Sequence, residues 1–526
     1  MSTSLGQACT PDTFSPSIGG TDILSLEATP ITGYNATVTA GSRFTAPDID
    51  LVNAEFCNVT IQYTHANDSN HVITVEAWLP LHRDWNQRFL AVGGGGWNAG
   101  RSDFGRLAMS GAIADGFATI VTDAGLGEAA DPSEWALVRP GEVDMINFRN
   151  QAYQALEDEA LFGKALVQDF YGAAPSFSYF NGCSQGGRQG LLLAQRYPDL
   201  YDGIAAIAPA IYFTELLPYM AWGQQLMNER RQYPYACEID AITAAALSAC
   251  DGLDGVKDRL LSRVDECLAT FDPHSMINKN IPCAQTEQGQ MDITKVAADL
   301  VEEVWRGMPI MRNNQSSIYP GVSPGANLTG TDALPMLLGT ACADGTCFGN
   351  LGPLAEGYIK YFLAKDPEAI FDTSMTREEF LDTIVARSRE EYGAILDSSD
   401  PDLTAFHASG GKMVTWHGLM DPLIPHRATE DYYNAVAGIS PDVQEFYRYF
   451  EAPGIEHCTG GPSQVPTKLF KQLQAWVEEG VAPDASDVQV KVGCATHERI
   501  LCAYPKRAVY QEDCGDVSLA ACWTCQ

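Results

Sequence analysis

A serine held between glycines is the clearest candidate for nucleophilic chemistry in this chain. Residues 182–186 read Gly-Cys-Ser-Gln-Gly, and they lie between a β-rich run at 176–180 and a helix-forming stretch at 187–197. A G-x-S-x-G sequence in this setting places the serine on a sharp strand-to-helix turn, with its hydroxyl exposed at the end of a sheet. The helix N-terminus favours negative charge that develops there. The motif predicts acyl transfer with Ser184 as nucleophile, and a glycine-rich turn with an incidental serine is the alternative.

A serine hydroxyl needs a base to become a good nucleophile, and the chain has only nine histidines. His457 lies in the loop after the last predicted strand, 445–450, which is where a fold with this serine turn carries its base. His407, His417 and His426 surround an earlier strand. We therefore expect His457 to be the base, and a surface position is the alternative.

The acid that orients the base is expected between serine and histidine in chain order. Asp421 lies in the loop that leaves the predicted strand 412–416, so it should reach the carboxyl edge of the sheet. There it would hold the histidine tautomer and stabilise the imidazolium. Asp400, Asp402 and Glu456 are rivals by composition, but they lack this position after a strand.

Two cysteines adjoin the predicted serine and histidine. Cys183 precedes Ser184, and Cys458 follows His457. If the serine and histidine share a hydrogen bond, their neighbours lie close enough for a disulfide, which requires Cα atoms about 4.4–6.8 Å apart. We expect a Cys183–Cys458 bond that fastens the nucleophile to the base.

Backbone amides are expected to stabilise the negative charge on the attacked carbonyl. A glycine run at 93–96 follows a short apolar strand, and glycine lets a backbone approach a substrate closely. The amides of Gly95 and Gln185 are our candidates for this oxyanion hole, and Gly94 and Gly96 remain open as alternatives to Gly95. A phosphate loop is excluded because no lysine follows the glycines.

Composition indicates a folded, acidic protein. The chain has 526 residues, 45% of them hydrophobic, and a net charge of -34. Such a charge repels nucleic acid and anionic membranes, so neither is an expected partner. No apolar run approaches the roughly 18 residues of a membrane span. The sequence leaves the oligomeric state open.

Cysteines and sequons indicate an oxidising compartment. There are 15 cysteines without zinc-ligand spacing, and the odd number leaves at least one thiol free or paired with another molecule. Five N-x-S/T sequons accompany them. We expect a secreted, disulfide-bonded glycoprotein. The first residues lack signal-peptide features, which we interpret as a mature form with an added initiator Met. The sequons are at Asn35, Asn58, Asn67, Asn314 and Asn327.

Strand and helix signals alternate before residue 211 and return after 403, which predicts a mostly parallel sheet with helices on both faces. Between them, residues 212–402 are rich in cysteine, proline and acidic helices. We therefore expect an α/β-hydrolase core made of 1–211 and 403–526, interrupted by an inserted domain at 212–402.

Three segments resemble the tannase and fungal feruloyl esterase family: Gly-Cys-Ser-Gln-Gly-Gly-Arg-Gln-Gly at 182–190, His-Gly-Leu-Met-Asp at 417–421 and Glu-His-Cys at 456–458. The glycine run and residues 401–406 are similar too. The resemblance implies a lid domain inserted between nucleophile and acid, and a small or polysaccharide-linked phenolic ester as substrate. Feruloyl esterase is our first expectation and tannase the second. Five aromatic residues of the insert line the acyl pocket or belong to the core: Tyr219, Trp222, Phe348, Tyr358 and Phe362.

The resemblance also implies a structural calcium site in the lid. Residues 251–258 read Asp-Gly-Leu-Asp-Gly-Val-Lys-Asp, and hard carboxylate oxygens of this kind suit Ca²⁺. A solvated acidic turn is the alternative. No catalytic cofactor is expected, because a serine mechanism needs none. By resemblance the ligands are the side chains of Asp251, Asp254 and Asp258 and the carbonyls of Val256 and Leu260.

Two other classes of protein use the same residues. A serine peptidase has the same three groups and differs in cleaving amides. A binding protein on this fold usually lacks one of the three, and none is missing here. An esterase is therefore the expected class.

Overall fold

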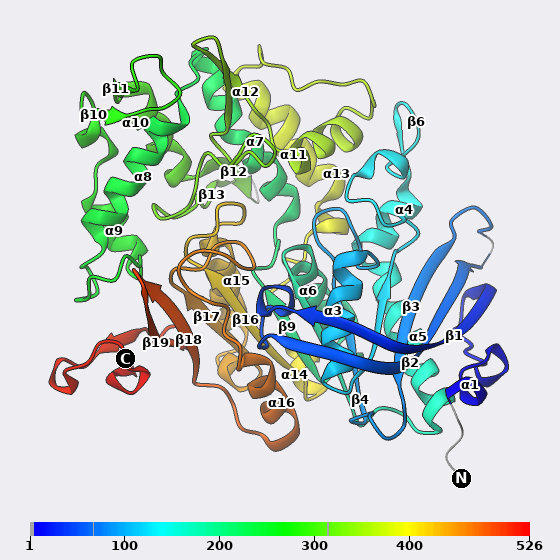
Figure 1. Ribbon diagram of the computed structural model, residues 1–526. Coiled ribbons are helices and arrows are strands. Elements are labelled where there is room, and N and C mark those ends of the chain that lie inside the picture. The colour runs from blue at the N-terminus through cyan, green and yellow to red at the C-terminus, as the bar shows by residue number, and fades with distance from the viewer. Residues whose placement is uncertain (1–4, 67, 313–314) are drawn as a thin grey trace.

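A nine-stranded sheet organises the chain, of which the computed structural model describes residues 5–66, 68–312 and 315–526. The strand order is β1-β2-β3-β5-β4-β8-β9-β16-β17 (Figure 1). The strands are β1 (Thr21–Val38), β2 (Ile49–His65), β3 (Ile73–Pro80), β4 (Arg88–Val92), β5 (Ala118–Thr122), β8 (Phe177–Cys183), β9 (Gly203–Ile207), β16 (Lys412–Gly418) and β17 (Tyr447–Ala452).

Every pairing from β5 to β17 is parallel, and the pairings among β1, β2, β3 and β5 are antiparallel. The mostly parallel sheet of the predicted α/β-hydrolase fold is confirmed. Because parallel strands end at one edge, the loops after β4, β8, β16 and β17 converge there. These loops carry the glycine run, Ser184, Asp421 and His457. The long antiparallel arm of β1 and β2 was not predicted.

Side chains alternate between the two faces of the sheet, and each face has its own helices. Neighbours on β8 show the alternation, since Tyr179 and Phe180 are both fully buried but belong to different hydrophobic clusters. Five helices cover the sheet, with α5, α6 and α15 against one cluster and α3 and α16 against the other face. They are α3 (Asp103–Ala114), α5 (Ala155–Tyr171), α6 (Gln185–Arg196), α15 (His426–Ile439) and α16 (Leu469–Glu479).

Between β9 and β16 the chain leaves the sheet and forms the lid segment, which we define as residues 212–402. It is drawn in green and yellow above the strands in Figure 1. It contains helices, as expected from the texture of the sequence after 212, and two-stranded hairpins that were not predicted, and its exact limits as a domain stay a prediction. Its main elements are α7 (Phe213–Arg230), α8 (Ala236–Cys250), α10 (Lys295–Arg306), α11 (Pro353–Gly357), α13 (Arg387–Leu396), β14 (Thr340–Ala343) and β15 (Thr346–Gly349).

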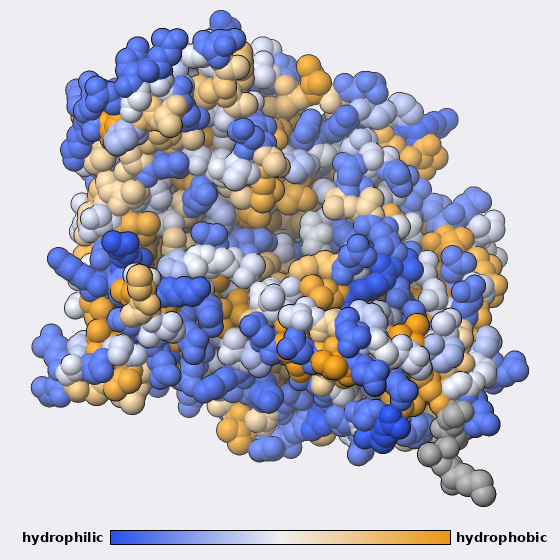
Figure 2. Space-filling model, in the orientation of Figure 1, coloured by the Kyte–Doolittle hydropathy of each residue, from blue (hydrophilic) through white to orange (hydrophobic). Residues whose placement is uncertain are grey.

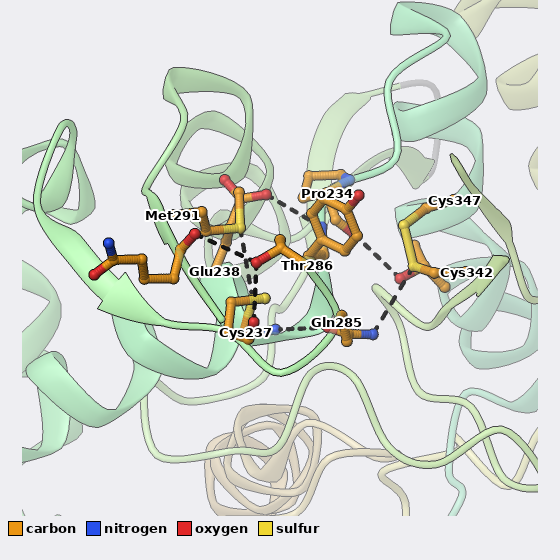
Figure 3. The surroundings of a disulfide bond; sticks show 12 residues. Pro234, Cys237, Glu238, Gln285, Thr286, Met291, Cys342 and Cys347 are labelled. Atoms are coloured by element: carbon orange, nitrogen blue, oxygen red, sulfur yellow. Dashed lines mark hydrogen bonds between the residues drawn. A yellow bond between two sulfur atoms is a disulfide. The ribbon is translucent and has the colours of Figure 1, made fainter. Parts of the chain in front are cut away.

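Three disulfides lie wholly inside the lid segment and stiffen it. Figure 3 shows how the side chain of Gln285 links two of them: its Oε1 accepts from the backbone N–H of Cys237, and its Nε2 donates to Cys342 Sγ. The three bonds are Cys237–Cys283, Cys250–Cys267 and Cys342–Cys347.

Seven disulfides form among the described residues, and Cys494 remains as an exposed free thiol. The odd cysteine expected from composition is therefore Cys494. Among the described helices, none has the length and apolar character needed to cross a bilayer. The C-terminal region adds the hairpin of β18 (Ala485–Val492) and β19 (Ala495–Cys502), which the sequence did not predict.

Candidate active site

Ser184 occupies a strained turn between β8 and α6. Its backbone has φ 64° and ψ -118°, a left-handed conformation that is costly for a residue with a side chain. The flanking glycines are required by space: a Cβ on Gly182 would lie 2.7 Å from the backbone of Gly186, and one on Gly186 would lie 2.9 Å from Gly94 O. The turn predicted from the motif is thus present, and it places the serine at the N-terminus of a 12-residue helix.

His457 and Asp421 meet at the same edge of the sheet. His457 Nδ1 lies 2.7 Å from Asp421 Oδ2, and this carboxylate is fully buried. Burial acts to raise the pKa of Asp421, but attraction to His457 and hydrogen bonds from two histidines outweigh it and hold the pKa well below its usual range. Asp421 therefore stays ionised and can stabilise a charged His457 ring. The rivals Asp400, Asp402 and Glu456 form no hydrogen bond to His457 among the described residues.

A second histidine, His417, holds the same carboxylate. Its Nε2 lies 3.1 Å from Asp421 Oδ2 and 3.0 Å from Ile424 O, and its Nδ1 lies 2.8 Å from Thr429 Oγ1. Nε2 faces two acceptors, so it carries the proton, and the Thr429 hydroxyl donates to Nδ1. The other oxygen of Asp421 accepts from the N–H groups of Leu423 and Ile424. From the sequence, His417 was only a rival candidate for the base; its position four residues before Asp421 was the available signal for its contact with the carboxylate.

Cys183 and Cys458 form a disulfide with a Cα–Cα distance of 5.9 Å. The bond brings residues on either side of a 275-residue separation together beside the serine and the histidine. Ser184 and His457 line one cavity, although no hydrogen bond joins their side chains among the described residues. Such contacts are often long or misaligned until a substrate is bound.

The candidate amides of the oxyanion hole differ in their availability. Gln185 is the first residue of α6, so its N–H has no acceptor within the helix. In the glycine run, the Gly94 amide donates to Gln189 Oε1 and the Gly95 amide donates to Asn98 O. The Gly96 amide has no acceptor among the described residues, and Gly96 lines the cavity. Gly95 was our first candidate, and this geometry favours its neighbour Gly96.

A buried arginine that the sequence analysis did not single out fixes Gln185. The Arg188 guanidinium donates to the side-chain oxygen of Gln185, to Leu396 O in the lid segment and to Gln151 O. It is fully buried, and burial lowers its pKa to about 9. The side-chain nitrogen of Gln185 also donates to Gln151 Oε1, so both polar atoms of this side chain are hydrogen-bonded. These bonds fix the position of Gln185 and of its backbone N–H.

A cavity of about 350 Å³ lies beside Ser184 and His457. Its walls come from the core, from α7 and α11 of the lid segment, and from the loop after β16. In the orientation of Figure 1, Figure 2 shows apolar surface in the hollow between the lid segment and the sheet. The apolar side chains that line it are Phe44, Phe104, Ala210, Phe213, Leu216, Leu217, Met220, Leu354, Leu423 and Ile424.

The five aromatic residues of the insert, for which the sequence left the acyl pocket or the core open, lie away from the cavity. Tyr219, Trp222, Tyr358 and Phe362 are buried in the core, and Phe348 is exposed. None of the five lines the cavity in the described part of the chain. The core alternative therefore holds for four of them.

The loop expected to bind calcium offers hard oxygen donors, but the carboxylates of Asp251, Asp254 and Asp258 are not among the described groups whose ligand atoms all lie within 4.8 Å of one another. Asp251 Oδ1 accepts from the N–H groups of Asp258 and Arg259, which closes the loop. Burial raises the pKa of Asp254 and of Asp258, and neighbouring carboxylates raise each pKa further. Buried carboxylates that repel one another are stabilised by a cation such as Ca²⁺. Asp258 also forms an ion pair with the buried Arg499 at 3.0 Å, and this guanidinium neutralises part of the negative charge of the loop.

The sequons differ in exposure. Asn35 and Asn327 are exposed, whereas Asn58 is half-buried on strand β2 with a shielded side-chain oxygen. Asn67 and Asn314 lie outside the described residues. Asn35 and Asn327 are thus the more accessible of the three described positions.

Comparisons with known proteins agree with this geometry. The family model "Tannase and feruloyl esterase" matches residues 57–526. A protein of Arthroderma benhamiae named "Probable feruloyl esterase" is 33% identical over 523 residues, covering 97% of this chain and 92% of its own. Among solved structures, tannin acyl hydrolase from Aspergillus niger has a TM-score of 0.87 at 26% identity, covering 100% of this chain and 96% of its own. Feruloyl esterase B from Aspergillus oryzae has a TM-score of 0.75 at 25% identity, and 97% of each chain is covered.

The mostly parallel sheet, the strained serine turn and the buried aspartate–histidine pair define an α/β-hydrolase. Within that class, the chain belongs to the tannase and feruloyl esterase family, and the resemblance drawn from its sequence is confirmed. It is a carboxylic ester hydrolase.

Proposed function

We propose that this protein is a secreted serine esterase that releases phenolic acids, ferulate first among them, through an acyl-enzyme. One observation carries the proposal: the Cys183–Cys458 bond fastens Ser184 to His457, whose ring is bonded to the ionised Asp421. The relative named "Probable feruloyl esterase" supports the choice of substrate. Tannase is the second candidate, supported by the likeness to tannin acyl hydrolase.

The first step is attack on the ester carbonyl. Ser184 Oγ forms a bond to the carbonyl carbon while its proton passes to Nε2 of His457. Asp421 stabilises the imidazolium from the Nδ1 side. The amide of Gln185 and one amide of the glycine run, Gly96 or Gly95, donate to the oxyanion.

Collapse of this intermediate releases the alcohol, which takes the proton from His457, and leaves the acyl group on Ser184. Water then attacks the acyl-enzyme while His457 removes its proton. Return of that proton to Ser184 releases the acid. No metal takes part in either step, and the calcium loop serves stability alone.

Hydrolysis of methyl ferulate, methyl caffeate and methyl gallate tests the assignment. We expect turnover of the panel and its loss in Ser184→Ala, with Cys494→Ser as a matched control at an exposed position away from the cavity. Turnover retained by Ser184→Ala refutes the mechanism. Faster cleavage of the corresponding anilides indicates a peptidase, and a folded wild type without any turnover indicates a binding protein.

Four further properties belong to the proposal. The lid domain spans 212–402 and is inserted in a core of 1–211 and 403–526. Calcium binds in the lid through the three carboxylates and two backbone carbonyls named above, and the preference of Ca²⁺ for oxygen ligands of this kind supports this. Secretion is supported by seven disulfides among the described residues. Glycans on the exposed sequons Asn35 and Asn327 are expected for a secreted chain.

A further inference from the structure

The cavity beside Ser184 offers very few polar side chains to a bound ring. Within the described residues, its lining contains no Asp, Glu, Lys or Arg. The polar side chains in the lining are those of Ser184, Gln185, His457 and Thr459. The first and third perform the reaction, and the side chain of Gln185 is already bonded to Gln151 and Arg188. Of these four side chains, only that of Thr459, an exposed residue, remains to pair with a substrate hydroxyl.

A smaller chamber of about 50 Å³ adjoins this cavity. The two share Met220, Leu354 and Leu423, so these three side chains contribute to the walls of both. The remaining walls of the small chamber come from lid residues 334–337 and 352–355 and from Pro422. No residue that lines it, within the described chain, has a polar side chain.

A buried hydroxyl without a partner loses its hydrogen bonds to water and gains nothing in return. A methyl ether at the same ring position has no O–H to satisfy, and its methyl group gains from burial against Met220 or Leu354. An apolar pocket therefore discriminates between free phenols and their methyl ethers. The direction of that discrimination follows from the lining alone.

We propose that this cavity favours acyl rings with more methyl ethers and fewer free hydroxyls, so that ferulate, with one of each, is preferred to the catechol ring of caffeate and to the galloyl ring. The inference rests on the proposed function, because it assigns the ring of the acyl group to the cavity beside Ser184. Met220, Leu354 and Leu423, which line both the cavity and the chamber, are then the residues that determine specificity for the ring.

Matched ester pairs test the proposal, because each pair differs only in methylation of the ring oxygens. We would measure kcat/KM for methyl 3,4-dimethoxycinnamate against methyl caffeate, and for methyl 3,4,5-trimethoxybenzoate against methyl gallate. The expected ratio is at least tenfold in favour of the methylated ester in each pair. A ratio of one or below in both pairs overturns the proposal.

A substitution in the wall shared by the cavity and the chamber tests the role assigned to these side chains. Met220→Gln places an amide where a ring hydroxyl would lie, so it should lower both ratios at least fivefold. Met220→Leu conserves volume and apolarity, so it should keep the wild-type ratios. If wild type and Met220→Gln are both folded and have equal kcat/KM ratios, Met220 does not determine the specificity. Leu423→Asn replaces Met220→Gln if the latter does not fold.

Hydrolysis of p-nitrophenyl butyrate separates this inference from the proposed function. Its small acyl chain carries no ring hydroxyl, so its turnover reports the catalytic residues alone. Turnover that depends on Ser184, together with ratios of one or below, overturns the specificity and leaves the esterase intact. Turnover that persists in Ser184→Ala overturns both.

Discussion

Removal of the Cys183–Cys458 bond should reduce both stability and activity, and its cost is calculable from the chain. The bond closes a loop of 275 residues. The chain-entropy relation gives about 5.5 kcal/mol for a loop of that length, as an upper figure because residual structure in the denatured chain lowers it. We therefore expect Cys183→Ala combined with Cys458→Ala to lower the free energy of unfolding by 3 kcal/mol or more, roughly the middle of the usual range.

The lid disulfide Cys342–Cys347 provides a matched control. It closes a loop of only five residues, for which the same relation gives about 2 kcal/mol. Neither cysteine lines the cavity in the described structure. Cys342→Ala combined with Cys347→Ala should therefore lower stability less and leave kcat unchanged.

Activity distinguishes the two disulfides further. Loss of the bond between Cys183 and Cys458 lets the loop of His457 move relative to Ser184, and displacement of a reacting group by 1 Å costs about 100-fold in rate. Denaturant unfolding followed by fluorescence and kcat on p-nitrophenyl butyrate measure the two effects. Equal destabilisation by both double substitutions, or full kcat without the Cys183–Cys458 bond, would refute the reasoning.

Four other outcomes follow from the site and its surroundings. Asp421→Asn should lower kcat about 10⁴-fold, because the amide favours the wrong tautomer of the histidine, while Asp400→Asn leaves kcat unchanged. His417→Phe removes a donor to the same carboxylate and should lower kcat roughly 10- to 100-fold, as for other groups that support a site indirectly; an unchanged kcat in steady-state assays contradicts this. Burial raises the pKa of Asp397 to about 7. The stability that this group contributes is therefore complete below pH about 4 and is lost as the pH rises to 7. Over this pH range, the unfolding temperature of Asp397→Asn should fall less than that of the wild type. Chelation with EDTA should lower the unfolding temperature of the wild type and have no effect on Asp254→Asn, whose loop has lost a ligand; equal shifts in both proteins would place the effect at another site.

The sequence predicted the parts of the fold that are buried and continuous. The apolar runs 88–92 and 118–122 became β4 and β5 with the same bounds, because each is fully or almost fully buried and has few other ways to satisfy its backbone. β1 and β2 were missed because their residues are mostly exposed or half-exposed and their pairing contains bulges, which break the period of two.

Within the site, chain order and spacing indicated Ser184, Asp421 and His457, since each lies in the segment that leaves the carboxyl end of a strand of the sheet. The spacing of His417 four residues before Asp421 was a local signal for their bond, but the contact of His417 with Thr429, which orients its ring, could not be predicted from that spacing. Nothing in the sequence indicated that the backbone N–H of Gly95 would donate to Asn98 O within a turn. The cavity lining could not be predicted either, because it combines Phe44 and Phe104 of the core with Phe213 of the lid segment, residues far apart in the sequence.

Peptide mapping after reaction with a serine-directed fluorophosphonate tests the central claim most directly. The folded protein should acquire one adduct, on the peptide that contains residue 184, with parallel loss of ester hydrolysis. Denatured protein and His457→Ala should remain unlabelled. An inactivating adduct on a different residue, or full inactivation without any adduct on Ser184, would contradict the account.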